Sequence, residues 1–276
     1  MKKIIYAIAL ILLACPMFAQ DFQMKWNRVH MDGSRTGATA PDADNVRQAL
    51  GEVRDGVYYA PNGKVFKDGT VVKAAELLIA AQPQMAYVKE VIGYSPREVD
   101  SSTRPQNEIA NLIVDRIMAK TAEITGKKVD AGIANFGGIR VDLPQGNVLL
   151  DDILSMLPFE NYLSYVQLKG SDLRALYKQF AEGRMQVVGG VELTIKDHQL
   201  IDIKVGGEPL DDDKLYGLAT IDFLLDGGDD VFCARNAQDL IITKTLVRDA
   251  VLPYMRELTA AGKNIEYHLD NRVVEL

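Results

Sequence analysis

The sequence has 276 residues, of which 47% are hydrophobic and 25% are charged. This balance excludes disordered and repeat proteins, and the length suffices for one large domain or two small ones. The formal net charge of −7 argues against a basic groove and therefore against a nucleic-acid polymer as partner.

The first 19 residues have the features of a secretory signal. Lys2 and Lys3 precede an apolar run at 4–14 that is too short to span a bilayer. We therefore expect no transmembrane segment and an exported product, periplasmic or extracellular. Cleavage after Ala19 is favoured and leaves 29 basic against 38 acidic residues, a net charge of −9. The alternative is a lipoprotein box that would anchor the chain through Cys15.

Residues 20–84 are expected to form an N-terminal extension ahead of a main domain at 85–276. Residues 21–44 are polar with little periodicity, which indicates an arm or loops. The turn pairs Asn62-Gly63 and Asp68-Gly69 separate short apolar runs in the manner of a small hairpin. A short helix is predicted at 73–81.

Helices and strands alternate through residues 85–276. Strong helical periodicity begins near Asn107, and a Gly-Ser-Asp cap at 170–172 predicts a helix that runs to about 182. Further helices are predicted at 150–157 and 244–261. Strands are predicted at 86–92, 129–134, 162–168, 191–196, 201–205, 215–223 and 265–269. The alternating pattern of 191–196 and 201–205 predicts an antiparallel hairpin. We expect an α+β fold, layered α/β/β/α, with mixed sheets and antiparallel hairpins.

The sequence Asn-Phe-Gly-Gly-Ile-Arg at 135–140 follows the predicted strand 129–134. Gly137 and Gly138 fall where the backbone must turn, and glycine accepts a positive φ or a close approach of other groups. Asn135 and Arg140 bracket this turn. An amide and a guanidinium beside exposed backbone N–H groups suit an anion or a sugar hydroxyl. The alternative is a tight turn with a surface arginine.

Two later stretches each place a phenylalanine near a turn or a strand end. Phe159 is followed two residues later by Asn161, and Phe223 is followed six residues later by Asp229. Taken alone, each phenylalanine is more typical of the hydrophobic core than of a stacking surface, and Asp229 is also explained as a cap on its glycine turn.

Together, four stretches in this order resemble the C-terminal, substrate-binding domain of the 5′-nucleotidase and 2′,3′-cyclic-nucleotide phosphodiesterase family. They are residues 107–115, 135–140, 157–161 and 223–229, and the resemblance extends from about residue 86 to the C-terminus. It implies that Phe159 and Phe223 sandwich a nucleobase. Stacking on an aromatic ring contributes about 1 to 3 kcal/mol per base and tolerates different bases.

The resemblance also implies roles for polar residues. Asn135 and Arg140 would contact ribose and phosphate at the glycine turn, Asn161 would meet the base edge, and Asp229 would meet the ribose hydroxyls or shape their loop. The family carries a further arginine shortly before the helix near 107. In this sequence Ser102 occupies the matching place, and Arg104, two residues closer to the helix, is the candidate for that contact.

In full-length relatives, hydrolysis is carried out by an N-terminal metallophosphatase domain. Its two-metal centre is built from Asp-x-His, Asn-His-Glu or Asn-His-Asp, and Gly-His-x-His segments, and it activates water and neutralises phosphoryl charge. The three histidines here, His30, His198 and His268, belong to no such segment. We therefore expect no catalytic residue and no cofactor in this chain, and divalent metals only in a partner.

The leading hypothesis is the nucleotide-binding half of an exported, split 5′-nucleotidase that acts in nucleotide catabolism. A separately encoded metallophosphatase subunit would supply the chemistry, and this chain would not hydrolyse nucleotides alone. One alternative is a free-standing exported protein that binds nucleosides or nucleotides. Another is a degenerate domain with a structural role that binds nothing.

Overall fold

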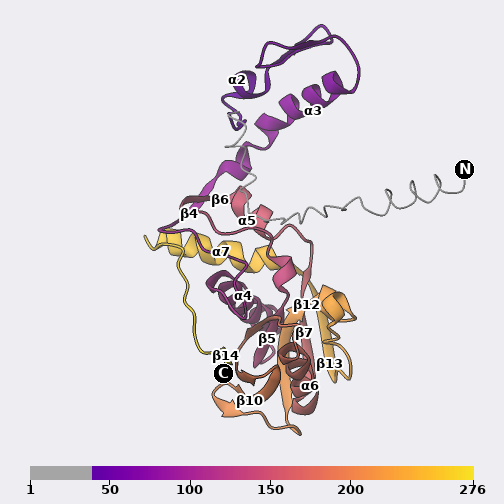
Figure 1. The fold of residues 1–276 in the computed structure, drawn as a ribbon, viewed down its shortest axis with the longest axis vertical. Coiled ribbons are helices and arrows are strands. Elements are labelled where there is room, and N and C mark those ends of the chain that lie inside the picture. Colours follow the sequence, from indigo (N-terminus) through magenta and orange to yellow (C-terminus); the bar gives the residue numbers. More distant parts are fainter. Residues whose placement is uncertain (1–38) are drawn as a thin grey trace, which may run out of the picture. The chain divides into compact units, whose positions relative to one another are not determined.

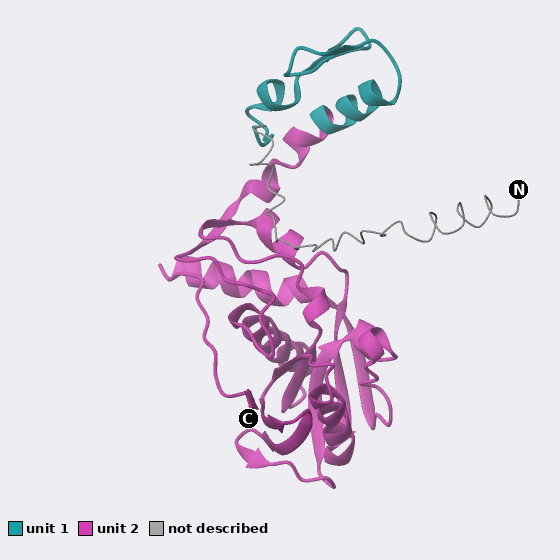
Figure 2. Ribbon diagram, in the orientation of Figure 1, with its two compact units in different colours: residues 1–79 teal, residues 80–276 magenta. Residues whose placement is uncertain are grey.

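The computed structural model describes residues 39–276, which form two compact units divided between Ile79 and Ala80 (Figure 2). The predicted signal at 1–19 and most of the predicted arm lie outside the described residues. Helix α3 (Thr70–Gln84) crosses the division and is longer than the helix predicted at 73–81. Within residues 39–276, no helix combines the length and the apolar character needed to cross a membrane.

The first unit contains a three-stranded antiparallel sheet. The predicted hairpin is present as β2 (Val57–Tyr59) and β3 (Val65–Phe66), and Tyr58 stacks on Phe66 with ring centroids 5.9 Å apart. The sequence analysis missed β1 (Glu52–Arg54), which pairs with β2, and the short helix α2 (Val46–Leu50).

Residues 80–276 have the mixed α+β fold predicted from the sequence (Figure 1). The five-stranded sheet has the order β13-β7-β12-β5-β8, in which β12 runs parallel to β5 and the other neighbours are antiparallel. Its strands are β5 (Ala131–Ala134), β7 (Tyr162–Lys169), β8 (Val187–Gly189), β12 (Leu215–Ile221) and β13 (Asp239–Leu246).

Two smaller sheets complete the strands of this unit. A four-stranded sheet contains β11 (Glu208–Pro209), β10 (Gln199–Val205), β9 (Val191–Lys196) and β14 (Val273–Glu275), in that order. Strands β4 (Val91–Ser95) and β6 (Gly146–Leu149) form a separate pair. The predicted hairpin of 191–196 and 201–205 is confirmed as β9 and β10.

Four α-helices pack around these sheets. They are α4 (Glu108–Thr125), α5 (Leu150–Met156), α6 (Gly170–Ala181) and α7 (Val247–Ala260). Helix α4 covers one face of the five-stranded sheet, where a Cβ on Gly132 would lie 2.6 Å from Met118 Cγ. Helix α7 packs against α4 and β4, and α6 packs against β7 and β10.

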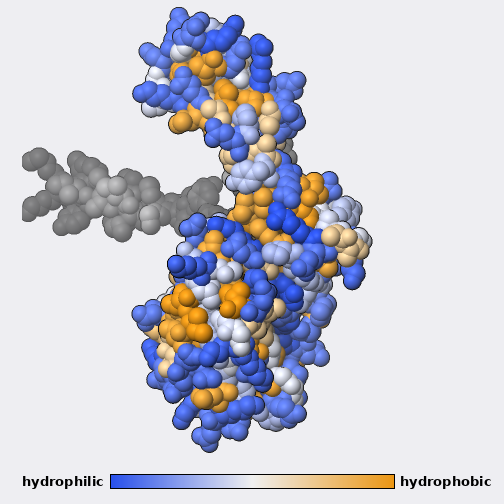
Figure 3. Space-filling view, turned by 180° about the vertical axis from the view of Figure 1, so that it is seen from behind, coloured by the Kyte–Doolittle hydropathy of each residue, from blue (hydrophilic) through white to orange (hydrophobic). Residues whose placement is uncertain are grey.

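The start of α4 is where the sequence predicts it. The Asn107 side chain accepts a hydrogen bond from the Ala110 N–H at 2.8 Å, which caps the helix. The four apolar residues at helical spacing are all buried: Ile109, Leu112, Ile113 and Ile117. The outer surface of residues 80–276, seen from behind, is mostly hydrophilic with scattered apolar areas (Figure 3), as is usual for a folded domain.

Several predicted boundaries are wrong. Residues 86–89 form a 3₁₀ helix, and the strand predicted at 86–92 begins only at Val91. Residues 239–246 form β13, so α7 begins at Val247 and not near 244. The strand predicted at 215–223 ends at Ile221. The short strands β6, β8 and β11 carry too few residues for a periodic pattern and were missed.

The closing strand predicted at 265–269 does not exist. Its polar groups are satisfied without a ladder, since Asn111 Nδ2 donates to the His268 carbonyl at 3.2 Å and the Ile265 N–H donates to the Tyr94 carbonyl at 2.8 Å. The last strand is β14, which pairs in parallel with β9.

The predicted cap of α6 is also wrong, because the helix begins at Gly170 and has no side-chain cap. The loop at 211–214 replaces it: the Gly170 N–H donates to the Lys214 carbonyl at 2.9 Å and the Ser171 N–H to the Asp212 carbonyl at 3.0 Å. A Cβ at Gly170 would lie 2.0 Å from the Asp211 carbonyl oxygen, so only glycine permits this approach.

The hairpin β9–β10 departs from strict alternation at one place. The register shifts between Leu200 and Asp202, and Ile201 is 57% exposed instead of buried. A bulge of this kind changes the face on which the next side chain lies.

Candidate functional site

The three predicted site segments meet at one edge of the five-stranded sheet. Ala131 of β5 lies opposite Leu218 of β12 in a parallel pair, and Leu163 of β7 lies opposite Ile221 in an antiparallel pair. The ends of β5 and β12 and the beginning of β7 therefore share an edge. Residues 135–140, 157–161 and 223–229 are adjacent to these three strand ends.

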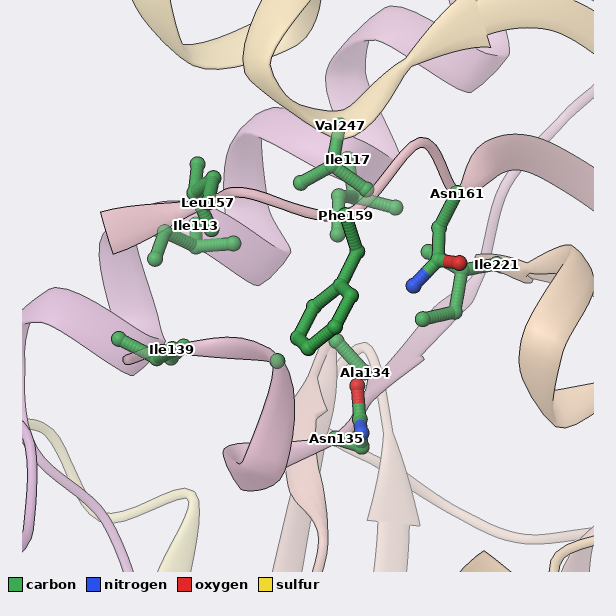
Figure 4. A pocket seen from close by; sticks show the side chains of 11 residues that line it. Ile113, Ile117, Ala134, Asn135, Ile139, Leu157, Phe159, Asn161, Ile221 and Val247 are labelled. Carbon is green, nitrogen blue, oxygen red and sulfur yellow. The ribbon is translucent and has the colours of Figure 1, made fainter. Parts of the chain in front are cut away.

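A shallow pocket opens at this edge (Figure 4). Phe159 is 48% exposed, and its ring projects across the pocket toward Ala134 and Asn135. Asn135 and Asn161 supply the polar side chains of the lining. The remaining side chains are aliphatic: Ile113, Ile117, Ala134, Ile139, Leu157, Ile221 and Val247.

Sequence reasoning missed most of this apolar lining. The spacing of Ile113 and Ile117 predicts a buried face of α4 but does not say that part of it reaches the pocket. Val247 begins α7, and it arrives at the site because Leu246 of β13 lies opposite Tyr162 of β7.

Asn135 is held at this edge by a carboxylate. Asn135 as a whole is 7% exposed, and its Nδ2 donates to Asp229 Oδ2 at 2.9 Å. A Cβ on Gly138 would lie 2.7 Å from Asn135 Oδ1, and one on Gly137 would lie 3.7 Å from Asp229 Oδ2. Neither glycine has a positive φ. Gly138 therefore provides space beside the amide, whereas a Cβ on Gly137 would make only ordinary contacts, and neither glycine is required for an unusual backbone conformation.

Arg140 lies at the exposed end of the same turn. Its Nη1 donates to the Gly137 carbonyl at 3.2 Å, and its Cζ is 5.9 Å from the centroid of the Phe159 ring. A guanidinium at this distance from a ring face is attracted to it, so Arg140 and Phe159 form neighbouring parts of one surface.

Phe223 lies at the same edge but does not line the pocket. It belongs to the 3₁₀ helix η4 (Asp222–Leu224) and is 43% exposed. Asp222 Oδ1 accepts from the Phe223 N–H at 2.9 Å and from the Tyr162 N–H at 3.0 Å. This carboxylate ties the loop that carries Phe223 to the first residue of β7.

Arg104 faces a different hollow. It lines an open groove together with Asp229. Its Cζ is 3.7 Å from the centroid of the Phe136 ring, and its burial there lowers the pKa of the Arg104 guanidinium. At the place where an arginine was expected, Ser102 Oγ donates to Asp100 Oδ1 at 2.6 Å. Arg104 does not line the pocket, and the groove that it lines is bordered by Asp229, which accepts the hydrogen bond from Asn135.

Within residues 39–276, no cluster of three or more His, Cys, Asp or Glu side chains is arranged to hold a metal ion. His198 lies in the turn between β9 and β10, and His268 stacks on Tyr267 with ring centroids 4.8 Å apart. His30 lies outside the described residues. The assignment of divalent metals to a partner chain stays a prediction.

Comparison with known proteins identifies relatives of the segment that contains these residues. The family model described as "5′-nucleotidase, C-terminal domain" matches residues 85–235, which include every candidate site residue. Cell wall protein Lmo0130 of Listeria monocytogenes is 31% identical over 215 residues, which are 68% of this chain and 27% of that protein. The trifunctional nucleotide phosphoesterase protein YfkN of Bacillus subtilis is 27% identical, over 68% of this chain and 14% of that protein.

The fold is also shared with a solved structure. The 5′-nucleotidase precursor of Thermus thermophilus superposes with a TM-score of 0.63 at 24% identity, over 80% of this chain and 48% of that one. The chain therefore spans about half the length of this solved relative and about a quarter or less of the two curated ones.

Proposed function

The chain belongs to the family of 5′-nucleotidase C-terminal domains, and we propose that it binds a nucleoside or nucleotide as the substrate-binding part of a 5′-nucleotidase. The observation that carries this proposal is the pocket that combines the exposed Phe159 ring, an aliphatic floor and the amides of Asn135 and Asn161. A flat aromatic surface with a few placed polar groups suits a nucleobase.

Each polar group of the site would contact a different part of the proposed nucleotide. Asn161 offers both a donor and an acceptor to the edge of a base stacked on Phe159. The Asn135–Asp229 pair, joined at 2.9 Å, would meet the sugar hydroxyls. Arg140, at the exposed end of the turn, would meet the phosphate, for which its guanidinium is suited.

We infer that hydrolysis requires a separately encoded metallophosphatase. This chain would hold the nucleotide while the partner's two metal ions activate water and stabilise the phosphoryl oxygens. The name of YfkN as a nucleotide phosphoesterase supports a role in nucleotide catabolism, and the name of Lmo0130 as a cell wall protein supports export. Residues 1–19 would then be the signal.

A calorimetric titration of residues 20–276 with adenosine and AMP tests the binding proposal. Saturable heats are expected with both ligands. Adding the metallophosphatase to AMP and this chain should release phosphate, whereas binding without phosphate release would favour the free-standing binding protein. No heat with any nucleoside or nucleotide would contradict the binding proposal.

Replacement of Phe159 by alanine should weaken adenosine binding about tenfold or more, because it removes one stacking surface. Phe223→Ala should do the same if the 3₁₀ helix supplies the second surface. Tyr94→Ala is the matched control, since Tyr94 on β4 is also 48% exposed and lies outside the pocket. Unchanged affinity of Phe159→Ala would show that the base, if bound, does not stack there.

A further inference from the structure

We propose that Gln179 and Arg184 are positioning residues that hold the Asp229 carboxylate against Asn135. They act through the backbone and side chain of Asp230. Their effect on ligand affinity rests on the proposed function, whereas their effect on the Asn135 amide does not.

The turn that contains Asp229 and Asp230 has an unusual backbone conformation. Asp229 and Asp230 follow Gly227 and Gly228, and they have φ values of +51° and +60°. Two consecutive non-glycine residues in the left-handed region are disfavoured, even though aspartate tolerates it better than most. Such a conformation persists only where surrounding contacts over-determine it, and it is concentrated at functional sites.

The contacts that hold this turn come from α6 and the residues just after it. Gln179 Nε2 donates to the Asp230 carbonyl at 2.8 Å, and Arg184 forms an ion pair with the Asp230 carboxylate. Within the turn, the Gly227 N–H donates to the Val231 carbonyl at 2.8 Å. The main chain of Asp230 is therefore held by Gln179, and its side chain by Arg184, both from outside the turn.

Fixing Asp230 also sets the direction of the preceding side chain. Asp229 Oδ2 accepts from Asn135 Nδ2, so the amide of Asn135 has a defined orientation in the pocket lining. If the turn relaxed to ordinary φ values, the Asp229 carboxylate would leave this position. The Asn135 amide would then lose its acceptor, and either its oxygen or its nitrogen could face a ligand.

The first readout is the side-chain amide resonance of Asn135 in ¹⁵N-labelled protein, with Asp229→Ala as the reference for a released amide. Gln179→Met and Arg184→Gln should each move this resonance toward the reference. Gln145→Met removes a similar amide bond to the Pro96 carbonyl, and Arg174→Gln removes an ion pair of α6 with Asp212. These two controls should leave the resonance unchanged.

The second readout is a double-mutant cycle on adenosine affinity. Gln179→Met and Arg184→Gln should each weaken binding about threefold or more in the wild-type background, and neither should weaken it further in Asp229→Ala, as expected for residues in one network. A merely structural role would lower thermal stability in both backgrounds without this pattern.

The two readouts separate the two proposals. An Asn135 resonance that neither variant moves would overturn the positioning role, whatever the affinities are. If the wild-type chain binds no nucleoside, the proposed function fails, and the amide resonance still decides whether Gln179 and Arg184 hold Asp229.

Discussion

Replacing Arg272 by methionine should lower the free energy of unfolding of the unit at 80–276 by about 2 kcal/mol, because the half-buried Asp115 carboxylate and the buried Val188 carbonyl lose their donor. Arg272 is 6% exposed. Its Nε and Nη2 donate to Asp270, both Nη atoms donate to Asp115 at 3.0 and 3.2 Å, and Nη1 also donates to the Val188 carbonyl at 3.1 Å. One side chain thus joins α4, β8 and the segment before β14.

Urea denaturation measures this loss, and Arg256→Met is its control. Arg256 pairs with Glu90 at 2.9 Å, but both side chains are about half exposed. Exposed pairs contribute roughly 0 to 1 kcal/mol, so the control should change little. Removing one charge together with its partner, in Arg272→Met with Asp115→Leu, should recover part of the loss. Equal effects of Arg272→Met and Arg256→Met would contradict this account.

The same network predicts a dependence on acid. The hydrogen bond from Arg272 lowers the pKa of the Asp270 carboxyl below its usual range. Because the folded state then favours the ionised form, this contribution is present above the unfolded pKa of about 3.9 and is lost as pH falls through the lower folded value. The stability difference between wild type and Arg272→Met should therefore shrink between pH 7 and pH 3. A constant difference across this range would contradict the assignment.

Local rules predicted the elements whose causes are local. Helix α4 has its cap at Asn107, and its apolar residues recur at helical spacing. In β9 and β10, apolar and polar residues alternate with a period of two. The strand predicted at 265–269 failed because Asn111 and Tyr94, distant in sequence, satisfy its backbone. Local sequence patterns do not identify such partners, because these residues become neighbours only when the chain has folded.

The site also combines features that local sequence predicts with features that depend on tertiary structure. The sequence points to Asn135, Phe159 and Asn161, and the structure brings them to one pocket. Their meeting depends on β5 running parallel to β12 while β7 runs antiparallel, which is a tertiary choice. Arg104 was assigned by its distance from Asn107 along the chain. In the structure its guanidinium lies over the Phe136 ring and lines the groove that Asp229 also lines, and this position could not be predicted from its distance along the chain.

Gly228→Ala should abolish most nucleoside binding while leaving the rest of the unit folded. A Cβ at this position would lie 2.0 Å from the Phe223 carbonyl oxygen and 2.8 Å from Phe223 Cδ1. The oxygen belongs to the backbone and cannot rotate away, so the loop from 222 to 231 must shift. Overpacking of this kind costs about 1 to 3 kcal/mol of stability. Because the loop carries both Phe223 and Asp229, adenosine affinity should fall about tenfold or more.

A second glycine separates the loss of affinity from a general loss of stability. Gly206 has a φ of +61° and open space around its missing Cβ, so Gly206→Ala should destabilise the chain by about 1 to 2 kcal/mol through backbone strain without changing adenosine affinity. Adding Phe223→Ala to Gly228→Ala should weaken binding no further, because the shifted loop has already removed the ring. If Gly228→Ala keeps wild-type affinity, Phe223 and Asp229 do not act from this loop, and the binding surface is confined to the pocket beneath Phe159.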